Sequence, residues 1–283
     1  MLKSESLRLG FGCSGVLGKR WFSEEKCATI LRAAIDAGIV HFDTAGFYGE
    51  AEQRLGRVLK DVPADNVFIS SKTGTRFDAS SNKRGRVVKN FSQNAIIADV
   101  EASLKRLHRE RLDILYLHGP DTDQIAASEQ VFSKLKAQGK IRYAGVCGHG
   151  KYLDMAAGVP YIDVVMGKYN ILNQAHETVF AKAKKNGKTV VSIAPLMGGL
   201  YRKGLFLPTT RSQFWYLARA LARNRSDLWQ AHTRLNMPKG PGQSQAGQAL
   251  EFVFENKNID IALTTTTRED HLQASIAIAQ QTP

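Results

Sequence analysis

Short apolar runs alternate with segments of helical periodicity along the whole chain. Each run has four to seven residues, the length of a buried strand. The runs are Leu9–Cys13, Val40–Asp43, Val67–Lys72, Leu112–His118, Ile141–Val146, Val164–Tyr169, Thr189–Ala194 and Ile259–Leu263. Strands that alternate with helices are typical of α/β proteins with a parallel sheet.

The segments between the runs carry the pattern of amphipathic helices. Within Glu24–Ala37, Ile30 and Ala34 fall on one apolar stripe. Ser23 is the expected N-cap of this helix and Gly38 its end. Further helices are expected over Glu50–Lys60, Asn94–Leu107, Ser128–Gln138, Thr178–Asn186, Ser244–Glu255 and Glu269–Gln280.

Eight strands separated by helical segments are what a closed (β/α)8 barrel requires. We therefore expect an α/β fold, a (β/α)8 TIM barrel that forms a single domain over residues 1–283. A doubly wound open sheet is the alternative, and it would carry a glycine-rich phosphate turn near its first strand. The glycines of Gly10-Phe-Gly-Cys-Ser-Gly have the wrong spacing for that turn, which favours the barrel.

Residues 201–243 interrupt the regular alternation. This segment is longer than an ordinary connection and indicates an insertion of basic loop and helix. Phe214–Arg225 has helical periodicity and is expected to pack on the barrel, with contact to a membrane or an acidic partner as the alternative. Its apolar stripe consists of Leu217, Ala218, Leu221 and Ala222.

Composition excludes several classes of protein. The 283 residues are 43% hydrophobic, a globular balance, and no apolar run reaches the roughly 18 residues of a membrane span. No apolar signal region follows Met1. Cys13, Cys27 and Cys147 match neither a disulfide framework nor the spacing of metal ligands. We therefore expect a protein of the reducing cytoplasm without a metal site.

The net charge of +13 is concentrated in two segments. Residues 73–93 carry a net charge of +4 and residues 201–243 a net charge of +7, which together make 11 of the 13 charges. Each segment follows an expected strand, so both should lie on the active-site face of a barrel. A basic field there would favour an anionic ligand, and a solvated basic surface is an equally simple alternative.

Four polar side chains stand at or just past the ends of successive apolar runs. Asp43 and Tyr48 follow the second run, Lys72 ends the third and His118 ends the fourth. If the strands are parallel, all four emerge at the same end of the sheet. Taken singly, each has a structural explanation. Asp43 could cap a turn and Tyr48 could be an amphipathic residue of the wall. Lys72 could reach solvent, and His118 could be a buried imidazole with its hydrogen bonds made. Their joint placement indicates proton transfer instead.

The four groups suit the reduction of a carbonyl. Tyr48 can supply the proton, although the ordinary pKa of a phenol is about 10. The ammonium of Lys72 would lower the pKa of the phenol, and Asp43 would hold that ammonium in place. A neutral His118 could donate a hydrogen bond that orients the substrate oxygen.

The pattern Asp43-x-Ala-x-x-Tyr48-Gly, followed by Glu52, Leu55-Gly56, Lys72 and His118, closely resembles that of the aldo-keto reductases. The resemblance covers nearly the whole chain and is strongest from Leu7 to His118. It implies that Tyr48 is the general acid, Asp43 and Lys72 tune it, and His118 orients the substrate. A nicotinamide cofactor would supply the hydride. The early motifs also resemble the branch that oxidises aldoses at the anomeric carbon, so the direction stays open.

The resemblance weakens where the family binds its cofactor. The usual Ser-Asn after the fifth strand is here Cys147-Gly148, and the usual glutamine of the sixth strand is Met166. The Tyr-Ser-Pro-Leu that many members carry after the seventh strand is here Ile193-Ala-Pro-Leu196. Both amides that would hold the nicotinamide carboxamide are therefore missing, a loss of about 1 kcal/mol for each hydrogen bond.

The loop after the eighth strand keeps hydroxyl and basic groups where the family binds the adenosine phosphate. A guanidinium at Arg268 suits a 2′-phosphate, which favours NADP(H) over NAD(H). The residues that the resemblance assigns to the cofactor are Gly12, Asp43, Thr44, Cys147, Gly148, Met166, Ile193, Ala194, Leu196, Thr264, Arg268 and His271.

We therefore expect an NADP(H)-dependent oxidoreductase that acts on a small aldehyde or ketone, or on the corresponding alcohol or sugar. Whether that substrate is anionic stays open. A regulatory subunit that binds the nicotinamide with little or no turnover is the alternative, because the amide anchors are missing. Neither nucleic acid nor membrane is expected as a partner, since charge alone gives only salt-sensitive association. The sequence does not indicate the oligomeric state.

Overall fold

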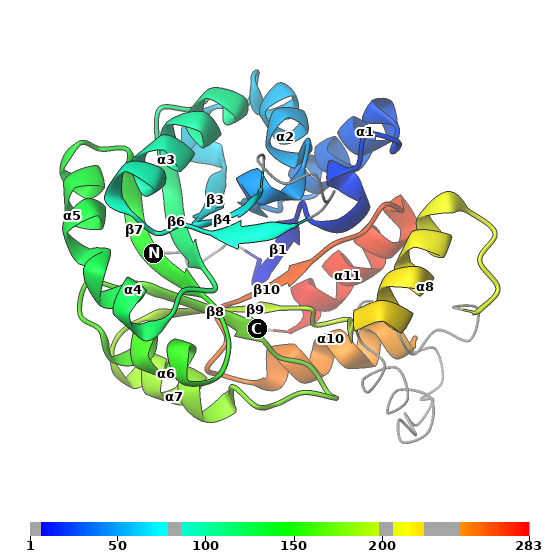
Figure 1. Cartoon of the computed structure of the whole chain (residues 1–283). Helices are drawn as coiled ribbons and strands as arrows, with labels where there is room; N and C mark the ends of the chain where they lie inside the picture. Colours follow the sequence, from blue (N-terminus) through cyan, green and yellow to red (C-terminus); the bar gives the residue numbers. More distant parts are fainter. Residues whose placement is uncertain (1–6, 79–85, 198–205, 224–243, 283) are drawn as a thin grey trace.

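The strands close into a barrel surrounded by helices (Figure 1). The computed structural model describes residues 7–78, 86–197, 206–223 and 244–282. Eight parallel strands follow one another in the order β1-β10-β9-β8-β7-β6-β3-β2, and β2 pairs with β1 to close the ring. They are β1 (Leu9–Gly12), β2 (His41–Asp43), β3 (Phe68–Thr73), β6 (Leu112–His118), β7 (Ile141–Cys147), β8 (Val164–Lys168), β9 (Thr189–Ile193) and β10 (Ile261–Thr264). The predicted (β/α)8 barrel is confirmed.

The two-residue period of the strands separates the interior of the barrel from the layer beneath the helices. In β6, Ile114 and Tyr116 belong to one buried cluster, while Leu115 and Leu117 belong to the larger cluster under the helices. His118 comes two residues after Tyr116 and therefore continues the inner series at the end of the strand. The alternation of apolar side chains thus decides which polar residues face the interior.

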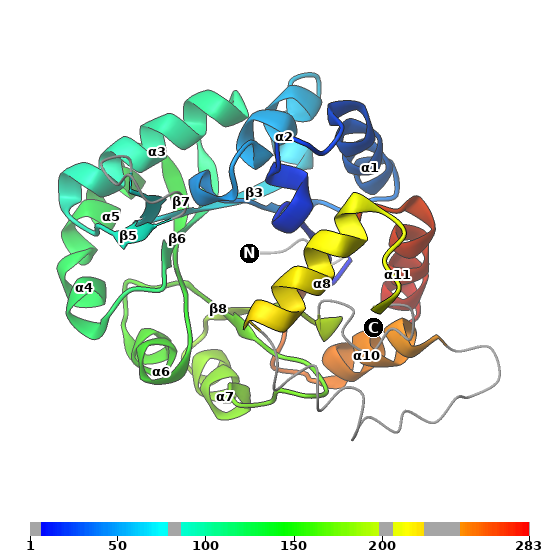
Figure 2. The ribbon, with the colours of Figure 1, turned by 45° about the vertical axis from the view of Figure 1, so that its right-hand side comes forward.

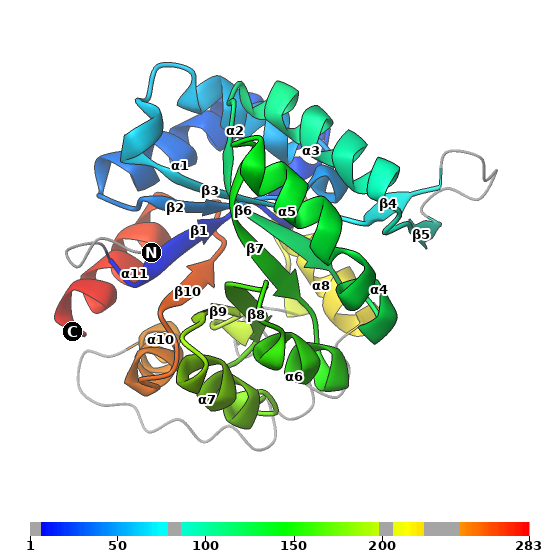
Figure 3. The same ribbon diagram turned by 90° about the vertical axis from the view of Figure 1, so that its left-hand side faces the viewer.

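The helices pack around the barrel, and Figure 3 shows the strands between α1, α2 and α3 on one side and α6, α7 and α10 on the other. The predicted cap of α1 is confirmed, because the Ser23 side chain accepts a hydrogen bond from the Lys26 amide at 3.2 Å. Gly38 ends that helix with a φ of +83°. The helices are α1 (Glu24–Asp36), α2 (Ala51–Leu59), α3 (Gln93–Leu107), α4 (Thr122–Ala127), α5 (Glu129–Ala137), α6 (Gly150–Gly158), α7 (Glu177–Lys185), α8 (Arg211–Arg223), α10 (Gln245–Glu255) and α11 (Glu269–Gln281).

Two additions follow the carboxyl ends of strands and so lie on one face of the barrel. After β3, the short strands β4 (Thr75–Phe77) and β5 (Val87–Lys89) form an antiparallel hairpin that the sequence pattern did not predict. After β9 comes α8, which Figure 2 shows in front of the barrel strands. Short 3-10 helices lie between β1 and α1, between β2 and α2 and before β3, namely η1 (Gly15–Gly18), η2 (Gly46–Tyr48) and η3 (Ala64–Asn66).

The helix predicted over Phe214–Arg225 exists, and its described part is α8. The remainder of the predicted insertion, residues 201–205 and 224–243, lies outside the described residues. The predicted packing stripe is wrong except for Leu217, because its other three residues, Ala218, Leu221 and Ala222, are exposed. The helix packs instead through the neighbouring face, which presents Trp215, Tyr216, Leu217 and Ala220 to the protein.

Candidate active site

The four predicted catalytic side chains come together at the carboxyl ends of three neighbouring strands. Asp43 ends β2, Lys72 lies in β3 and His118 ends β6, and these strands are hydrogen-bonded in that order. Tyr48 ends η2, directly after β2. Asp43 and Lys72 are buried, while Tyr48 and His118 are half-buried.

Lys72 and Asp43 form a buried ion pair. The Lys72 Nζ donates to Asp43 Oδ2 at 2.5 Å and to the Thr44 carbonyl at 2.8 Å. The second carboxylate oxygen, Oδ1, accepts a hydrogen bond from the Ser70 hydroxyl at 2.9 Å. A buried charge is costly unless it is paired and hydrogen-bonded, and here both members of the pair are.

The same ammonium faces the phenol of Tyr48. Lys72 Nζ lies 4.8 Å from the centroid of the Tyr48 ring. Burial raises the pKa of Tyr48 to about 12, while the charge of Lys72 and its hydrogen bond to the phenol pull that pKa down. The lowering that we expected from Lys72 is therefore present but smaller than the effect of burial. Burial also lowers the pKa of Lys72, but Asp43, Tyr48 and Cys147 outweigh it and leave that pKa above its ordinary value.

His118 is a neutral imidazole beside the phenol. The His118 and Tyr48 rings are 6.2 Å apart at an angle of 90°. Burial, Lys72 and Lys89 lower the pKa of His118 to about 3. Within the described part of the chain, its buried Nδ1 has no hydrogen-bond partner. A neutral imidazole keeps one N–H to donate, so it can polarise a carbonyl oxygen without adding a charge.

Backbone contacts fix the position of Tyr48. The Glu50 amide donates to the Gly18 carbonyl at 3.0 Å, which joins the loop after β1 to the loop after β2. A Cβ at Gly18 would lie 1.5 Å from the Tyr48 carbonyl oxygen, and one at Gly49 would lie 2.4 Å from the Gly18 carbonyl oxygen. Gly49 also has a φ of +70°, a conformation that glycine adopts readily. The main chain around the phenol therefore tolerates no side chain at either position.

The hydrogen-bond network extends deeper into the barrel than sequence reasoning found. His41 Nε2 lies 3.1 Å from the Ser70 hydroxyl, which in turn donates to Asp43. Burial and Lys72 lower the pKa of His41 to about 3, so this second imidazole is also neutral. The two-residue spacing of His41 from Asp43 along β2, and of Ser70 from Lys72 along β3, is a signal that could have indicated this network.

The remaining residues of the motif have a packing role. Glu52 is fully buried and accepts hydrogen bonds from the Ser71 hydroxyl and the Arg106 guanidinium, both at 2.6 Å. A Cβ at Gly56 would lie 2.2 Å from the Arg106 carbonyl oxygen. These contacts hold α2 against β3 and α3, next to the loop that carries Tyr48.

The residues predicted to face the cofactor lie at or beyond the ends of five other strands and of β2. Cys147 is paired in register with His118 on one side and Met166 on the other, so both adjoin the catalytic groups. The thiol of Cys147 is buried, and burial raises its pKa to about 11. The others are Gly12 at the end of β1, Thr44 after β2, Gly148 after β7, Ile193 at the end of β9 with Ala194 and Leu196 beyond it, Thr264 at the end of β10, and Arg268 and His271 at the start of α11.

Observations at the strand ends fit a bound nicotinamide nucleotide. The buried hydroxyls of Thr44 and Thr264 have no hydrogen-bond partner among the described residues, so each keeps a donor for a polar ligand. A Cβ at Gly148 would meet Val146 Cγ1 at 3.8 Å, an ordinary contact, so the position has room for a ligand group. The strand ends can therefore accept a polar group, but no side chain projects from the position where the family carries an asparagine.

Arg268 is already engaged by a carboxylate. Its Nε donates to Asp270 Oδ1 at 2.9 Å and its NH2 group to Asp270 Oδ2 at 2.5 Å. Both side chains are exposed. A 2′-phosphate would have to replace Asp270 as the partner of this guanidinium.

Part of the basic charge on this face is neutralised within the protein. In residues 73–93, Arg76 pairs with Asp99 at 3.1 Å and Arg86 with Asp78 at 3.5 Å. Lys83 and Arg84 lie outside the described residues, as do Arg202, Lys203, Arg225, Asp227, Arg234 and Lys239 of residues 201–243.

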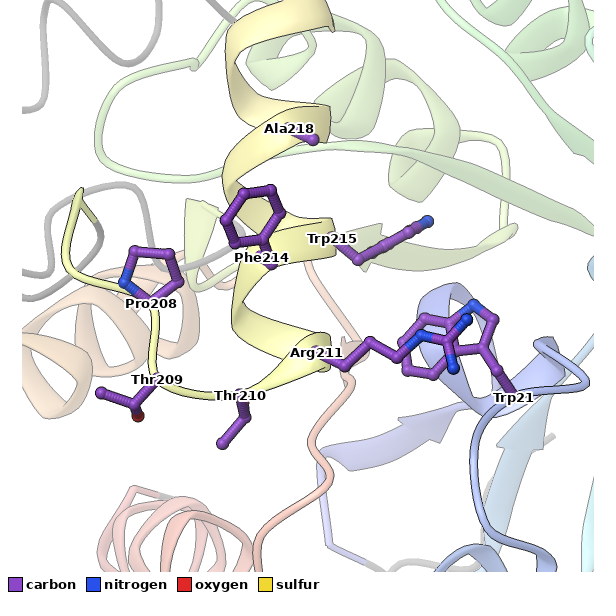
Figure 4. A pocket seen from close by; sticks show the side chains of 8 residues that line it. All are labelled: Trp21, Pro208, Thr209, Thr210, Arg211, Phe214, Trp215 and Ala218. Carbon is purple, nitrogen blue, oxygen red and sulfur yellow. The ribbon is translucent and has the colours of Figure 1, made fainter.

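A separate hollow lies beside α8 (Figure 4). Its volume is about 470 Å³, and Trp21, Arg211, Phe214 and Trp215 form much of its wall. The Arg211 guanidinium stacks over the Trp21 ring at 4.9 Å. None of the four predicted catalytic residues lines this hollow, so it is distinct from the proton-transfer centre.

The described residues hold neither a cluster of metal ligands nor a helix suited to cross a membrane. They contain no group of three or more histidine, cysteine, aspartate or glutamate side chains placed to hold a metal ion. No described helix combines the length and the apolar character needed to cross a membrane. Cys13, Cys27 and Cys147 are all buried and form no disulfide.

Comparisons with known proteins agree with the geometry. The family model "Aldo/keto reductase family" matches residues 8–282. D-threo-aldose 1-dehydrogenase of a Pseudomonas species is 28% identical over 68% of this chain and 66% of its own length. The NADH-specific methylglyoxal reductase of Escherichia coli is 30% identical over 68% of this chain and 64% of its own length, so each match spans less than two thirds of the relative.

A solved structure shows the same fold. The aldo-keto reductase AKR11C1 from Bacillus halodurans, in its holo form, superposes with a TM-score of 0.79 at 23% identity, over 100% of this chain and 92% of that chain. At this identity the likeness bears on the barrel architecture alone.

Proposed function

The chain belongs to the aldo/keto reductase family, and on this premise we propose that it is an oxidoreductase that uses a nicotinamide cofactor to interconvert a small aldehyde, ketone or sugar and its reduced or oxidised counterpart. The observation that carries the proposal is the contact of Tyr48 with the Lys72–Asp43 ion pair, beside a neutral His118. When bound, the nicotinamide supplies or accepts the hydride.

The chain's own residues handle the proton. Tyr48 Oη donates its proton to the carbonyl oxygen during reduction and accepts one from the hydroxyl during oxidation. Lys72 stabilises the phenolate that forms when the proton leaves, and Asp43 and the Thr44 carbonyl hold the ammonium in place. His118 donates a hydrogen bond to the same substrate oxygen and fixes its distance from the phenol.

We propose that Thr44 and Thr264 bind the nucleotide and that the space at Gly148 receives the nicotinamide amide. NADP(H) is the proposed form, because Arg268 stands at the start of α11 and the net charge of the chain is +13. The Arg268–Asp270 pair is exposed and thus weak in water, so a phosphate dianion can displace the carboxylate. One relative is named as NADH-specific, so titrations with both nucleotides are needed.

A kinetic experiment tests the proposed activity. The protein is mixed with NADPH or NADH and a panel of small carbonyl compounds, and the absorbance of the reduced nucleotide is followed. Replacement of Tyr48 by Phe should lower kcat by about 10²–10⁴-fold, because it removes the general acid and leaves the ring in place.

Tyr161→Phe is the matched control. The Tyr161 hydroxyl donates to the Ile125 carbonyl, away from the catalytic groups. This variant should lose about 1 kcal/mol of stability and keep its kcat. Equal turnover in the parent and in Tyr48→Phe would rule out the proposed role of the phenol.

A specific observation favours a second function. Gly148 carries no side chain, and the Met166 side chain is fully buried and apolar, so both amide anchors are missing. The second candidate is therefore a subunit that binds the nicotinamide nucleotide with little turnover. Calorimetric titration distinguishes the two, since tight NADPH binding without turnover of any carbonyl would support the subunit.

We also propose that the protein works in the cytoplasm. The support is that its three cysteines are unbonded, which suits a reducing compartment. Because the thiols are buried, cells are lysed directly into denaturant with an alkylating reagent; alkylation of all three would support the proposal, and a disulfide in the recovered protein would contradict it.

A further inference from the structure

The hairpin of β4 and β5 places a lysine next to the end of β6. In the antiparallel register, Thr75 lies opposite Lys89. The Thr75 hydroxyl donates to the His118 carbonyl at 2.8 Å, and the Lys89 ammonium donates to the carbonyl of Gly119, the next residue. Two hydrogen bonds therefore attach the hairpin to His118, the last residue of β6, and to Gly119, which follows it.

Gly119 allows this close approach. Its φ is +66°, and a Cβ there would lie 3.2 Å from Lys89 Nζ. The Lys89 ammonium thus contacts the backbone of the residue that follows His118. Its positive charge acts on the His118 imidazole, because Lys89 contributes to the lowered pKa of that ring.

Lys89 differs from the other described cations of the hairpin. Arg76 and Arg86 are each paired with an aspartate. In the part of the chain that the structure describes, no carboxylate lies within ion-pairing distance of Lys89; its hydrogen bond goes to a neutral carbonyl. The ammonium therefore keeps its net charge and, with three donors, has hydrogen bonds to spare.

Two aromatic rings also lie near the imidazole. The rings of Phe47 and Phe77 are 4.5 Å apart with an interplanar angle of 31°. Phe47 also contacts the His118 ring edge-on at 6.1 Å. Phe77 is 50% exposed, so part of its apolar surface is available to a ligand. The surroundings of His118 thus include the ring of Phe47, the ring of Phe77 packed near it, and the Lys89 ammonium at the next residue.

We propose that Lys89 selects an anionic carbonyl compound, one that carries a carboxylate or phosphate group on a carbon skeleton covered by Phe47 and Phe77. The inference rests on the proposed function, because the carbonyl oxygen must sit at Tyr48 and His118 for the anionic group to reach Lys89. The ammonium forms charge-assisted hydrogen bonds to the anionic oxygens, and such bonds are about twice as strong as neutral ones.

Matched substrates test the selection. The wild-type protein is assayed with 4-carboxybenzaldehyde and 4-methylbenzaldehyde, which have similar shapes and differ in charge, and with glyceraldehyde 3-phosphate and glyceraldehyde. The readout is the ratio of kcat/KM for the charged and the neutral member of each pair. This ratio should exceed about ten and fall with added salt, as expected for an exposed charge.

The variants attribute the ratio to Lys89. Lys89→Gln should lower it about tenfold through a higher KM for the charged substrate, because the charge is bound equally in ground state and transition state. Lys89→Arg should restore it. Arg86→Gln removes a cation of the same hairpin that is already paired with Asp78, and it should leave the ratio unchanged.

The outcomes separate this inference from the proposed function. A wild-type ratio near one, or an equal ratio in Lys89→Gln, would overturn the role of Lys89 while the reductase remains. If no carbonyl is reduced at all, calorimetric titration with 4-(hydroxymethyl)benzoate and 4-methylbenzyl alcohol still decides. The inference is supported if the wild type binds the anionic compound more tightly than the neutral one and Lys89→Gln removes this difference. Equal binding of the two compounds by the wild type refutes it.

Discussion

The two sides of the barrel mouth differ in how their side chains are held. At the ends of β2, β3 and β6, Asp43, Lys72 and Ser70 form a continuous set of hydrogen bonds that fixes the groups around Tyr48. At the ends of β7 and β8, Gly148 offers no side chain and Met166 only an apolar one. Under the proposed function, proton transfer and cofactor anchoring would therefore depend on different strands, and one can be strong where the other is weak.

The difference also concerns stability. The Lys72–Asp43 pair is buried, and its formation offsets the cost of removing two charges from water only while both partners are present. The apolar side has no such requirement, because Met166 and Ile193 pack with the interior cluster as ordinary hydrophobic residues. Substitutions on the two sides should consequently have effects of very different size.

The largest effect is expected when the ion pair is broken. Lys72→Met should destabilise the fold by about 3–5 kcal/mol, because it leaves the Asp43 carboxylate buried without its partner. It should also lower kcat by about 10²–10³-fold, since one preorganised charge at the phenol is lost. Denaturant unfolding and turnover measure the two effects. The double variant Asp43→Asn, Lys72→Met should recover part of the stability and none of the activity. If the double variant is as unstable as Lys72→Met, the unpaired Asp43 carboxylate is not the cause of the stability loss.

The pH dependence of turnover should reveal whether proton transfer at Tyr48 or release of the nucleotide limits the rate. Because burial raises the pKa of Tyr48 to about 12, the phenol stays protonated at neutral pH, and carbonyl reduction should be independent of pH between about 6 and 9. Oxidation needs the phenolate, whose fraction rises about tenfold per pH unit below the pKa. Steady-state rates at saturating nucleotide should therefore increase with pH for the alcohol only. A flat profile in both directions would mean that nucleotide release on the other side sets the rate.

The smallest effect is expected when the missing anchor is restored. Gly148→Asn places an amide where a Cβ meets nothing closer than 3.8 Å, and one added hydrogen bond of about 1 kcal/mol should tighten nucleotide binding about fivefold. Fluorescence titration with NADPH measures the change. Gly139→Asn is the control, since Gly139 has open space, a φ of +70° that asparagine tolerates better than other side chains, and a place after α5 at the other end of the barrel. Unchanged affinity in Gly148→Asn would show that the nicotinamide amide does not reach this position.

Much of the barrel could be predicted from the sequence because each strand is a short apolar run and most helices have an amphipathic stripe; the short helices α4 and α6 were not predicted. The hairpin of β4 and β5 was not predictable, since Thr75–Phe77 is too short and too polar to stand out from a loop. The packing face of α8 was assigned wrongly because periodicity defines an apolar stripe but not the surface on which the helix packs. Trp215 and Tyr216 pack against the loop after β1 instead.

The proximity of Asp43, Lys72 and His118 could be predicted because each stands at or near the end of a parallel strand, where topology brings them together; their catalytic role stays a prediction. The net pKa of Tyr48 could not, because it depends on how deeply the phenol is covered, and depth is not a property of sequence spacing. The Arg268–Asp270 pair was missed for a similar reason: two residues of opposite charge at this spacing meet only because of the local backbone before α11. The roles of the residues assigned to the cofactor stay predictions.

The contact of Gly18 with Gly49 has a consequence for how this protein can change. Because main chain meets main chain there, the phenol is located by the two loops rather than by the side chains that surround the substrate. Residues such as Phe47 and Phe77 can be exchanged to admit new compounds without shifting the acid. A screen for folded but inactive variants should therefore recover substitutions at these two glycines, which touch no reactant and yet silence the enzyme.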